Sequence, residues 1–377
     1  MPARDKKEML TPSSRWNLRL AVSTPLLTLP RYPAPMTPDQ PAVQIDPPPF
    51  DPSTGLIEGF VCDGAGGARP LPASELAHGL PRTPPGGYVW LHFQLQPARD
   101  WLPDHVDLDE QALRALLAEE TRPRCSRYGK GLLMNLRGVN LNEGHQPEEM
   151  VSLRILLRAN LLLTVRRQRL VAVERARNDC REGHAPELPA VLLLHLASGL
   201  NDRIEPIVDA LADRADDFEE LLVTKPGVDL RGRLAAMRHD AIVFRRYVAP
   251  QREALTRFAA NEAGLLPDEA LVLAREEADR TTRMVEELDS TRERAGVLDD
   301  QLAARRSDEM NRNMMVLSVV SAVFLPLGFL TGLLGINVGG MPGSDDPSAF
   351  WFVAGLCAGL GAVLFALFLR MGWLPKR

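Results

Sequence analysis

Closely spaced cysteines and a large net charge are both missing from this 377-residue chain. Its four cysteines lie far apart and form no CxxC pair, which argues against a disulfide scaffold or a structural zinc finger. The formal net charge is only −5, so the chain lacks the basic field that binds nucleic acid. It also lacks a P-loop, a GxSxG and an HExxH motif. We therefore expect neither an enzyme nor a bound cofactor.

Charged residues are also absent from two long stretches near the C-terminus. Residues 315–334 read MVLSVVSAVFLPLGFLTGLL, and residues 350–369 read FWFVAGLCAGLGAVLFALFL. About 20 uncharged residues are enough to cross a bilayer core as a helix. The sequence therefore predicts two membrane spans, at 314–335 and 350–370. The alternative is a pair of helices buried in the core of a large soluble domain.

The charges around these spans indicate how they are oriented. The flanking basic residues are Arg305, Arg306 and Arg312 before the first span and Arg370, Lys376 and Arg377 after the second. The loop between the spans, 336–349, has no Lys or Arg and carries the acids Asp345 and Asp346. Basic residues stay on the cytoplasmic side. We therefore expect both termini, including the tail 371–377, in the cytoplasm and the loop outside.

The first 57 residues are rich in proline. They contain twelve prolines, a composition typical of a disordered tail. The apolar stretch at 18–33 is interrupted by prolines and by charge, so it does not resemble a secretory signal. We interpret 1–57 as a disordered tail, part of which lies upstream of a plausible alternative start at Met36.

The segment 58–187 mixes strand and helix patterns. The run YVWLHFQL at 88–95 is aromatic-rich, and the runs at 131–141 and 151–167 break into short apolar pieces. Such pieces are typical of buried strands, whereas DEQALRALLAEE at 109–120 is typical of a helix. We predict an α/β cytoplasmic domain with a mostly buried sheet.

Helical periodicity dominates from 188 to 313, where apolar residues recur every three or four positions. The first two seams are Leu200, Ile204, Ile207, Leu211, Ala215, Phe218 and Leu222, and then Leu230, Leu234, Met237, Ala241, Phe244 and Val248. The third seam is Leu271, Ala274, Ala278, Thr281, Val285 and Leu288. Its helix starts near Pro267 and runs into the first span, roughly 100 Å in all. One chain offers few partners for such a helix, so we expect an oligomer.

Acidic residues outnumber basic ones along these helices. One helix carries Asp202, Glu205, Asp209, Asp213, Asp216, Asp217, Glu219 and Glu220. They are explained either as a solvated helix face or, repeated around an oligomer, as a chamber that concentrates cations. A denser group surrounds His105, with Asp104, Asp107, Asp109 and Glu110, and an acid-rich helix N-terminus explains it without a metal.

One face of the first span carries small and polar groups. Steps of three or four residues place together Asn311, Met314, Ser318, Ser321, Leu325, Gly328 and Gly332. Such a face suits either close helix packing or a narrow water-filled pore. It holds no carboxylate, His or Cys, whereas dehydrated Zn²⁺ prefers nitrogen and sulfur ligands. A divalent cation that crosses here therefore keeps much of its water. Gly355 and Gly359 form a GxxxG pair, which we expect to pack against the first span.

The stretch FLPLGFLTGLLGINVGGMPG at 324–343 resembles the CorA metal-ion transporter superfamily. The family hallmark is Gly-x-Asn at the outer end of the first span, here Gly335, Ile336 and Asn337. Ile in the middle position, GGxPG after it and RRYVAPQR at 245–252 resemble the ZntB zinc-transporter branch. The resemblance covers about residues 58–377.

The resemblance implies a funnel-shaped homopentamer in the bacterial inner membrane, with an α/β/α domain and long stalk helices in the cytoplasm. The first span lines the pore, and Asn337 forms a ring at its outer mouth. The family's pore positions fall on Asn311, Met314, Leu317, Leu325 and Gly328. The implied activity is Zn²⁺ transport, with Zn²⁺ as the cargo and a pentamer, the bilayer and divalent cations as partners.

Two alternatives remain open. One is a Mg²⁺, Co²⁺ or Ni²⁺ channel of the CorA type, and the other is a membrane-anchored coiled-coil scaffold that conducts nothing. The direction of transport and proton coupling do not follow from the sequence. No ionisable group lies within the first span, so proton coupling requires residues of the funnel or the mouth, or water itself.

Overall fold

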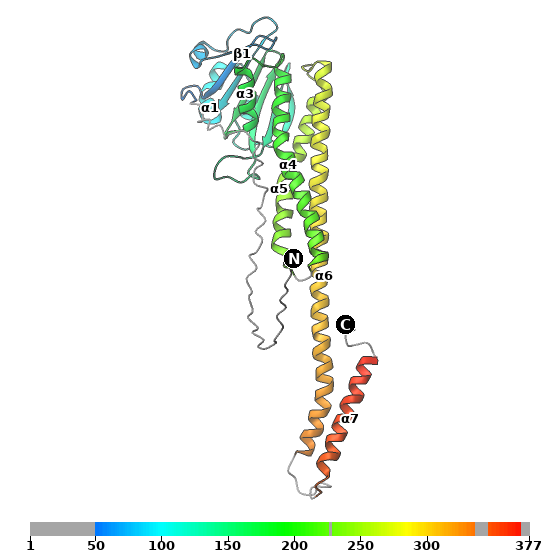
Figure 1. Cartoon of the computed structure of the whole chain (residues 1–377). Helices are drawn as coiled ribbons and strands as arrows, with labels where there is room; N and C mark the ends of the chain where they lie inside the picture. The colour runs from blue at the N-terminus through cyan, green and yellow to red at the C-terminus, as the bar shows by residue number, and fades with distance from the viewer. Residues whose placement is uncertain (1–49, 226–227, 336–345, 371–377) are drawn as a thin grey trace, which may run out of the picture. The chain divides into compact units, whose positions relative to one another are not determined.

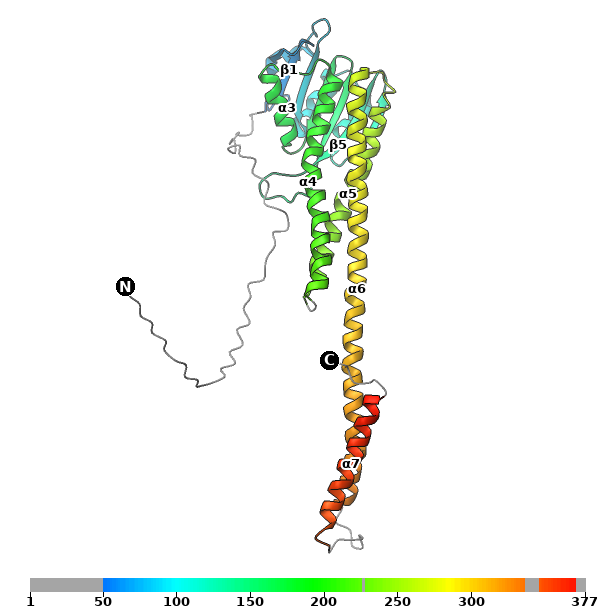
Figure 2. The same cartoon turned by 45° about the vertical axis from the view of Figure 1, so that its right-hand side comes forward.

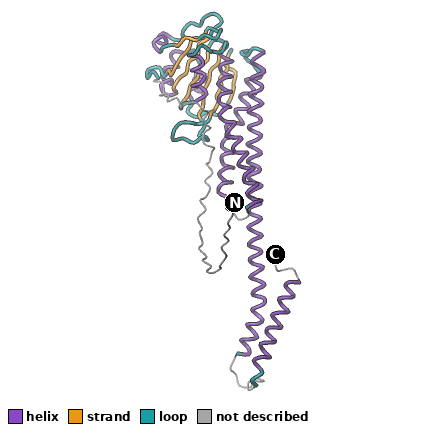
Figure 3. The backbone as a smooth tube through the Cα atoms, in the orientation of Figure 1, coloured by secondary structure: helices purple, strands orange, loops and turns teal. Residues whose placement is uncertain are grey.

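The computed structural model describes residues 50–225, 228–335 and 346–370. Figure 3 shows that the strands all lie in the N-terminal part of this described chain and that the rest is helical. The elements in chain order are β1 (Leu56–Cys62), β2 (Ala68–Pro70), the short 3-10 helix η1 (Ala73–His78), β3 (Tyr88–Gln94), α1 (Leu95–His105), α2 (Glu110–Leu117), β4 (Arg124–Tyr128), β5 (Gly131–Gly138), β6 (Val151–Arg158), β7 (Leu161–Arg166), α3 (Val171–Arg181), α4 (Pro189–Thr224), α5 (Arg231–Ala259), α6 (Asp268–Leu334) and α7 (Ala349–Arg370).

The strands form one sheet of seven in the order β2-β1-β3-β7-β6-β5-β4. β3 and β7 are parallel, and the other neighbours are antiparallel. β1 starts at Leu56 and pairs with β3, so the folded domain begins before the expected boundary at 58. Most of the expected disordered tail, residues 1–49, lies outside the described residues.

Side chains alternate between the two faces of the sheet, and each face has its own apolar core. In β3, Tyr88 and Trp90 join the core that contains α3 and the first part of α4. Val89, Leu91 and Phe93 point the other way, into the core with α1 and α2. Figure 2 shows α3 and α4 against the sheet. This confirms the predicted α/β/α arrangement, with β7 and β6 buried on both faces.

The three long helices α4, α5 and α6 pack side by side (Figure 1). The predicted α5 seam is confirmed, because all six of its residues are at most 2% exposed. In α4 one step of the prediction is wrong: Val208 is buried, whereas Ile207 is only half-buried. Steps of three and four both suit a helical seam, so the sequence pattern did not distinguish these two neighbours.

Ion pairs fasten α4 to α6 at two levels. Arg280 of α6 pairs with Asp202 and Glu205 of α4, with 2.7 Å between Arg280 Nη1 and Asp202 Oδ1. Two heptads further along both helices, Arg294 pairs in the same way with Asp216 and Glu219. The equal offset shows that α4 and α6 run parallel.

α6 continues without a break far beyond its partners and into the predicted first span. It starts after Pro267, whose extended backbone precedes the first turn, and it contains Pro326 near its end. α7 lies beside the last part of α6 in both views (Figures 1 and 2). α6 therefore belongs to two regions, a three-helix bundle with α4 and α5 and a two-helix end with α7.

Candidate functional site

The two-helix end is apolar and almost bare within one chain. Both α6 and α7 contain windows that are long and apolar enough to cross a membrane, and almost none of either window is buried. Large side chains such as Leu325, Phe329 and Trp351 are more than 70% exposed. A helix of a soluble core would be buried, so this exposure contradicts the soluble-core alternative. The surface needs lipid or further subunits to cover it.

α7 covers only one face of α6. On that face Val319 is 6% exposed, and Val323 and Leu330 are half-buried. A methyl group added at Gly361 of α7 would lie 3.8 Å from Leu327 Cδ1, which identifies the contact. The expected GxxxG contact is wrong: nothing lies within 4 Å of a methyl group built at Gly355 or at Gly359. α7 therefore approaches α6 through the face that carries Gly361.

The stripe expected to line a pore lies on the other side of α6. At about 100° per residue, its members project roughly opposite to the face that α7 covers. All of them are exposed: Asn311, Met314, Leu317, Ser318, Ser321, Leu325 and Gly328. Leu317 and Leu325 are 67% and 74% exposed. This face is free within the chain, as a surface shared with other subunits or with a pore must be.

Apart from the thioether sulfur of Met314, the described part of this face offers only oxygen atoms to a cation or its water. The hydroxyl of Ser321 donates to the Leu317 carbonyl at 2.9 Å, so its oxygen keeps lone pairs for a further donor. Pro326 has no N–H, so the Ala322 carbonyl lacks its usual helical donor. Water bound to a cation turns its hydrogens outward and needs such acceptors. The face therefore suits a hydrated ion better than a bare one.

The outer mouth is described only in part. Gly335 ends α6, and its amide donates to the Thr331 carbonyl at 2.9 Å. The predicted mouth residues Ile336, Asn337 and Asp345 lie outside the described residues. Asp346 is exposed and accepts hydrogen bonds from the amide and hydroxyl of Ser348 at 2.8 and 2.7 Å. These bonds lower the pKa of Asp346, so it stays ionised at the start of α7.

The acids of α4 are less available than the sequence suggested. Four of them, Asp202, Glu205, Asp216 and Glu219, pair with Arg280 or Arg294 of the same chain. Asp209 lies between the two sets, and its pKa is raised by burial first and then by Glu205 and Asp213. A cation-concentrating chamber would therefore draw on fewer carboxylates than the sequence contains.

The other candidate clusters do not form metal sites. His105 Nδ1 donates to the Trp101 carbonyl at 2.8 Å, and the imidazole ring stacks on the Trp101 ring. Asp109 accepts from the Ala112 amide at 2.8 Å, which makes it the N-cap of α2. Within the described ranges no three His, Cys, Asp or Glu side chains are grouped to hold a metal ion.

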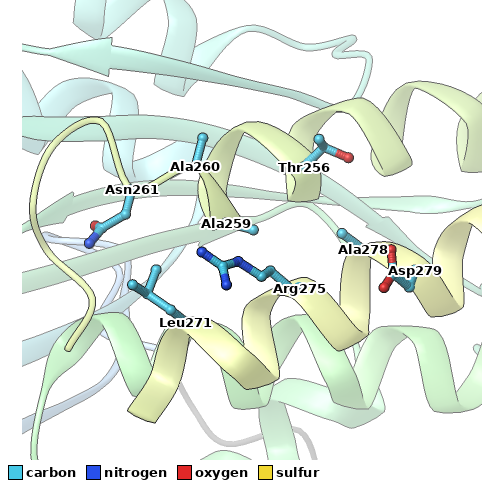
Figure 4. A pocket seen from close by; sticks show the side chains of 8 residues that line it. All are labelled: Thr256, Ala259, Ala260, Asn261, Leu271, Arg275, Ala278 and Asp279. Carbon is cyan, nitrogen blue, oxygen red and sulfur yellow. The ribbon is translucent and has the colours of Figure 1, made fainter. Parts of the chain in front are cut away.

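A surface cavity of about 320 Å³ lies where α5 turns into α6 (Figure 4). Asn261 holds this turn, because its side-chain oxygen accepts from the Leu265 and Leu266 amides at 2.9 and 3.0 Å. Arg275 and Asp279 contribute charges of opposite sign from α6. The cavity is far along α6 from the stripe and adds nothing to it.

Known proteins with similar sequences and structures are membrane transporters by name. Residues 85–370 match the family described as "CorA-like Mg²⁺ transporter protein". The chain is 37% identical over 324 residues to the divalent cation transporter CmaX of Pseudomonas aeruginosa, covering 85% of this chain and 97% of that protein. It is 32% identical over 300 residues to the zinc transport protein ZntB of Pectobacterium atrosepticum, covering 79% and 90%. The solved structure of full-length CmaX superposes with a TM-score of 0.74 at 36% identity, covering 85% of this chain and 99% of that one.

Proposed function

This chain belongs to the CorA-like Mg²⁺ transporter family, and from that premise we propose that it carries Zn²⁺ across a bacterial inner membrane through a central pore. Members of this family transport divalent cations and are not enzymes. The observation that carries the proposal is the position of the stripe: it lies on the face of α6 that α7 leaves bare.

In the proposed assembly five copies of α6 surround the pore. Each turns its stripe inward, while α7 packs on the outer side and meets the lipid. Asn337 of each copy lies in a ring at the outer mouth, where Gly335 ends the helix. Five side-chain amides would accept hydrogen bonds from the water shell of an arriving cation. Asp345 and Asp346 of the loop would raise the local concentration of cations before they enter.

The proposed ion moves with most of its water attached. Zn²⁺ without water binds His and Cys most strongly, and the described part of the stripe contains neither. Cys357 belongs to α7 and is only half-buried there. Backbone carbonyls, hydroxyls and amides instead accept hydrogen bonds from coordinated water. Selection then depends on the size and charge of the hydrated ion.

Two observations support Zn²⁺ over Mg²⁺ as the cargo. Ile336 occupies the middle of the Gly-x-Asn motif, and several similar proteins are named as zinc transport proteins. The membrane potential contributes about 2.3 kcal/mol per charge per 100 mV. For a divalent cation that enters the cytoplasm, this term alone drives uptake. Coupling to protons would add to it and would use groups outside the described spans, which contain no carboxylate or histidine.

The proposal is tested by metal flux into proteoliposomes, with Zn²⁺ compared to Mg²⁺ and with or without a pH gradient. Asn337→Ala is the test variant. Asn313→Ala is its matched control, because Asn313 lies on α6 near the start of the span but off the stripe. We expect Zn²⁺ flux to exceed Mg²⁺ flux, to collapse in the Asn337 variant and to persist in the control.

The other outcomes assign other functions. Mg²⁺ flux that exceeds Zn²⁺ flux would identify the chain as a magnesium channel of the CorA type. Absence of flux for both metals, from folded pentamers, would leave the non-conducting scaffold. Zn²⁺ flux that is equal with and without the pH gradient would rule out proton coupling.

A further inference from the structure

Buried polar side chains from α4, α5 and α6 meet in the seam between these helices. Asn201 of α4 and Thr281 of α6 are 0% exposed, and Gln251 of α5 is 1% exposed. Buried amides are costly unless all their donors and acceptors find partners. The two amides and the hydroxyl come from three different helices, so their hydrogen-bond partners need to be identified.

The three groups form a continuous chain of hydrogen bonds from the sheet to α6. Gln251 Oε1 accepts from the Arg137 backbone amide of β5 at 2.7 Å. Gln251 Nε2 donates to Asn201 Oδ1 at 3.2 Å. Asn201 Nδ2 then donates to Glu277 Oε2 at 2.9 Å and to Thr281 Oγ1 at 3.1 Å. We call Arg137, Gln251, Asn201, Glu277 and Thr281 the polar joint.

At the sheet, the polar joint begins with the backbone amide of Arg137, which lies beyond the end of the neighbouring strand β4. β4 pairs with β5 only as far as Asn135, so the edge of β5 beyond it is open at Arg137. Gln251 takes the place of the missing strand. The Arg137 side chain is fixed as well, because its guanidinium donates to the Thr121 and Met150 carbonyls and lies 4.4 Å from the centre of the Tyr247 ring.

The same contacts explain the RRYVAPQR segment at 245–252. Arg245 pairs with Asp289 of α6, Tyr247 lies between two guanidinium groups, and Gln251 enters the polar joint. This single segment of α5 thus touches the sheet, α4 and α6. Nothing in the proposed transport path uses it.

Apolar seams alone leave the axial position of a helix weakly defined, because Leu and Ala contacts re-form after a slip of one turn. A buried polar contact does not re-form, and for that reason a single buried Asn fixes the register of a coiled coil. The ion pairs of Arg280 and Arg294 are half-exposed, so solvent screens them and they hold the register less firmly.

We propose that Gln251 and Asn201 are positioning residues that fix the axial register of α6 against the sheet. α6 is unbroken from Asp268 to Leu334, so a register set at Thr281 is transmitted to the stripe at Met314, roughly 50 Å away. A displacement of β5 reaches the stripe along this path. The consequence for ion flux rests on the proposed transport function, whereas the register itself does not.

The register is tested in the full chain by pulsed EPR. Spin labels are attached to cysteines introduced by Lys130→Cys, in the β4–β5 turn, and Arg283→Cys, in α6, and the distance between the two labels is measured. Both positions are exposed. Labelled chains carry Cys357→Ala and are diluted with unlabelled chains, so that only distances within one chain are measured. We expect one narrow distance in the parent protein. Gln251→Met and Asn201→Leu, which keep side-chain volume but remove the bonds, should broaden it or shift it by about one helical turn, ~5 Å.

Matched variants distinguish the loss of a hydrogen bond in the polar joint from a general loss of stability. Thr281→Val removes a joint hydroxyl and should broaden the distance, whereas Thr282→Val, at a half-buried neighbour bonded only to the Ala278 carbonyl, should not. Gln251→Glu keeps the acceptor for Arg137 but loses the donor to Asn201. It should preserve the slow hydrogen exchange of the Arg137 amide, which Gln251→Met accelerates roughly tenfold, and still broaden the distance.

An unchanged distance in folded Gln251→Met, Asn201→Leu and Thr281→Val proteins would overturn the inference. These measurements need no metal, so they stand apart from the transport proposal. If the distance broadens and Zn²⁺ flux falls without a lower melting temperature, the register governs the pore. If the distance broadens but neither the parent nor any variant conducts ions, the register proposal is supported and the transport proposal is contradicted.

Discussion

The two halves of α6 share one backbone geometry and have opposite surroundings. In the bundled half α4 and α5 bury the seam, so that Thr281, Val285 and Leu288 are all at most 3% exposed. In the half from Asn311 onward nearly every described side chain is exposed, and α7 covers one face only. The apolar side chains of the first half are buried within the same chain, whereas those of the second half need lipid and other subunits to cover them.

Polar groups differ between the halves in the same way. The bundled half has ion pairs and the polar joint, in which each group has a partner of complementary chemistry. The described membrane half carries hydroxyls and carbonyls whose acceptor positions remain open, as at Ser321. Polar groups whose hydrogen bonds are all made within the chain hold its structure in place. Acceptors that remain open can instead bind the water shell of a moving cation. Stability and transport should therefore respond to different substitutions on one helix.

The largest expected difference comes from truncating a leucine in each half. Leu288→Ala removes a side chain that is 0% exposed, and it should lower the free energy of unfolding by about 3 kcal/mol through the lost contacts and the cavity left behind. Leu325→Ala, at 74% exposure, should change it by less than about 0.5 kcal/mol. Denaturant unfolding in detergent, followed by circular dichroism, measures both. Equal losses would show that Leu325 is packed as tightly as Leu288 in the assembly, and the stripe would then be a contact between subunits instead of an open face.

The next largest expected effect is a fall in Zn²⁺ flux when a bulky residue is introduced into the half of α6 that faces the pore. A methyl group built at Gly328 or at Gly355 meets nothing within 4 Å, so one chain tolerates either change. Gly328 belongs to the stripe and Gly355 does not. Gly328→Leu should therefore lower Zn²⁺ flux at least about tenfold by narrowing the pore, while Gly355→Leu leaves flux near the parent value. Equal fluxes in the two variants would remove the stripe from the pathway.

How far the sequence predicts the structure also differs between regions. The α5 seam from Leu230 to Val248 was predicted residue by residue, because apolar and polar positions alternate clearly along it. The contact between α6 and α7 was not predictable, since both helices are apolar all round and carry no periodic signal. The stripe was identified only by its few polar and small residues.

Some elements of the α/β domain were missed for another reason. α3 buries only small or β-branched apolar residues, and its buried face also contains Glu174 and Arg177. Arg177 donates to Glu174 and to Glu58 of β1, and Arg166 of β7 donates to Glu174 at 2.7 Å. Of these partners, Glu58 lies 119 residues from Arg177 in the sequence. A helix whose buried face includes charged residues leaves only a weak hydrophobic pattern to detect.

Acid should lower the stability of the part that contains the sheet but not that of the membrane part. His92 in β3 is fully buried, and burial first, then Arg166 and Arg177, hold its pKa well below the usual 6.5. A depressed histidine pKa means that stability is complete at high pH and falls once the unfolded chain takes up the proton. We expect a loss of about 1 kcal/mol between pH 6.5 and 5.5. Stability measured across this range should lose much of that dependence in His92→Gln, and an unchanged slope would contradict the assignment.

The smallest effect uses one substitution in both halves of α6. Gly296 and Gly332 are each helical, and a methyl group at either position meets nothing within 4 Å. Gly296→Ala should raise the free energy of unfolding by about 0.5–1 kcal/mol, because alanine loses less backbone entropy in a helix, and it should leave Zn²⁺ flux unchanged. Gly332 is part of the stripe, where the added methyl group faces the space that other subunits or ions share. Gly332→Ala should therefore lower flux without a matching loss of stability. If Gly296→Ala also lowered flux, ion transport would depend on the flexibility of the bundled half, and the division between a half that fixes the structure and a half that conducts ions would fail.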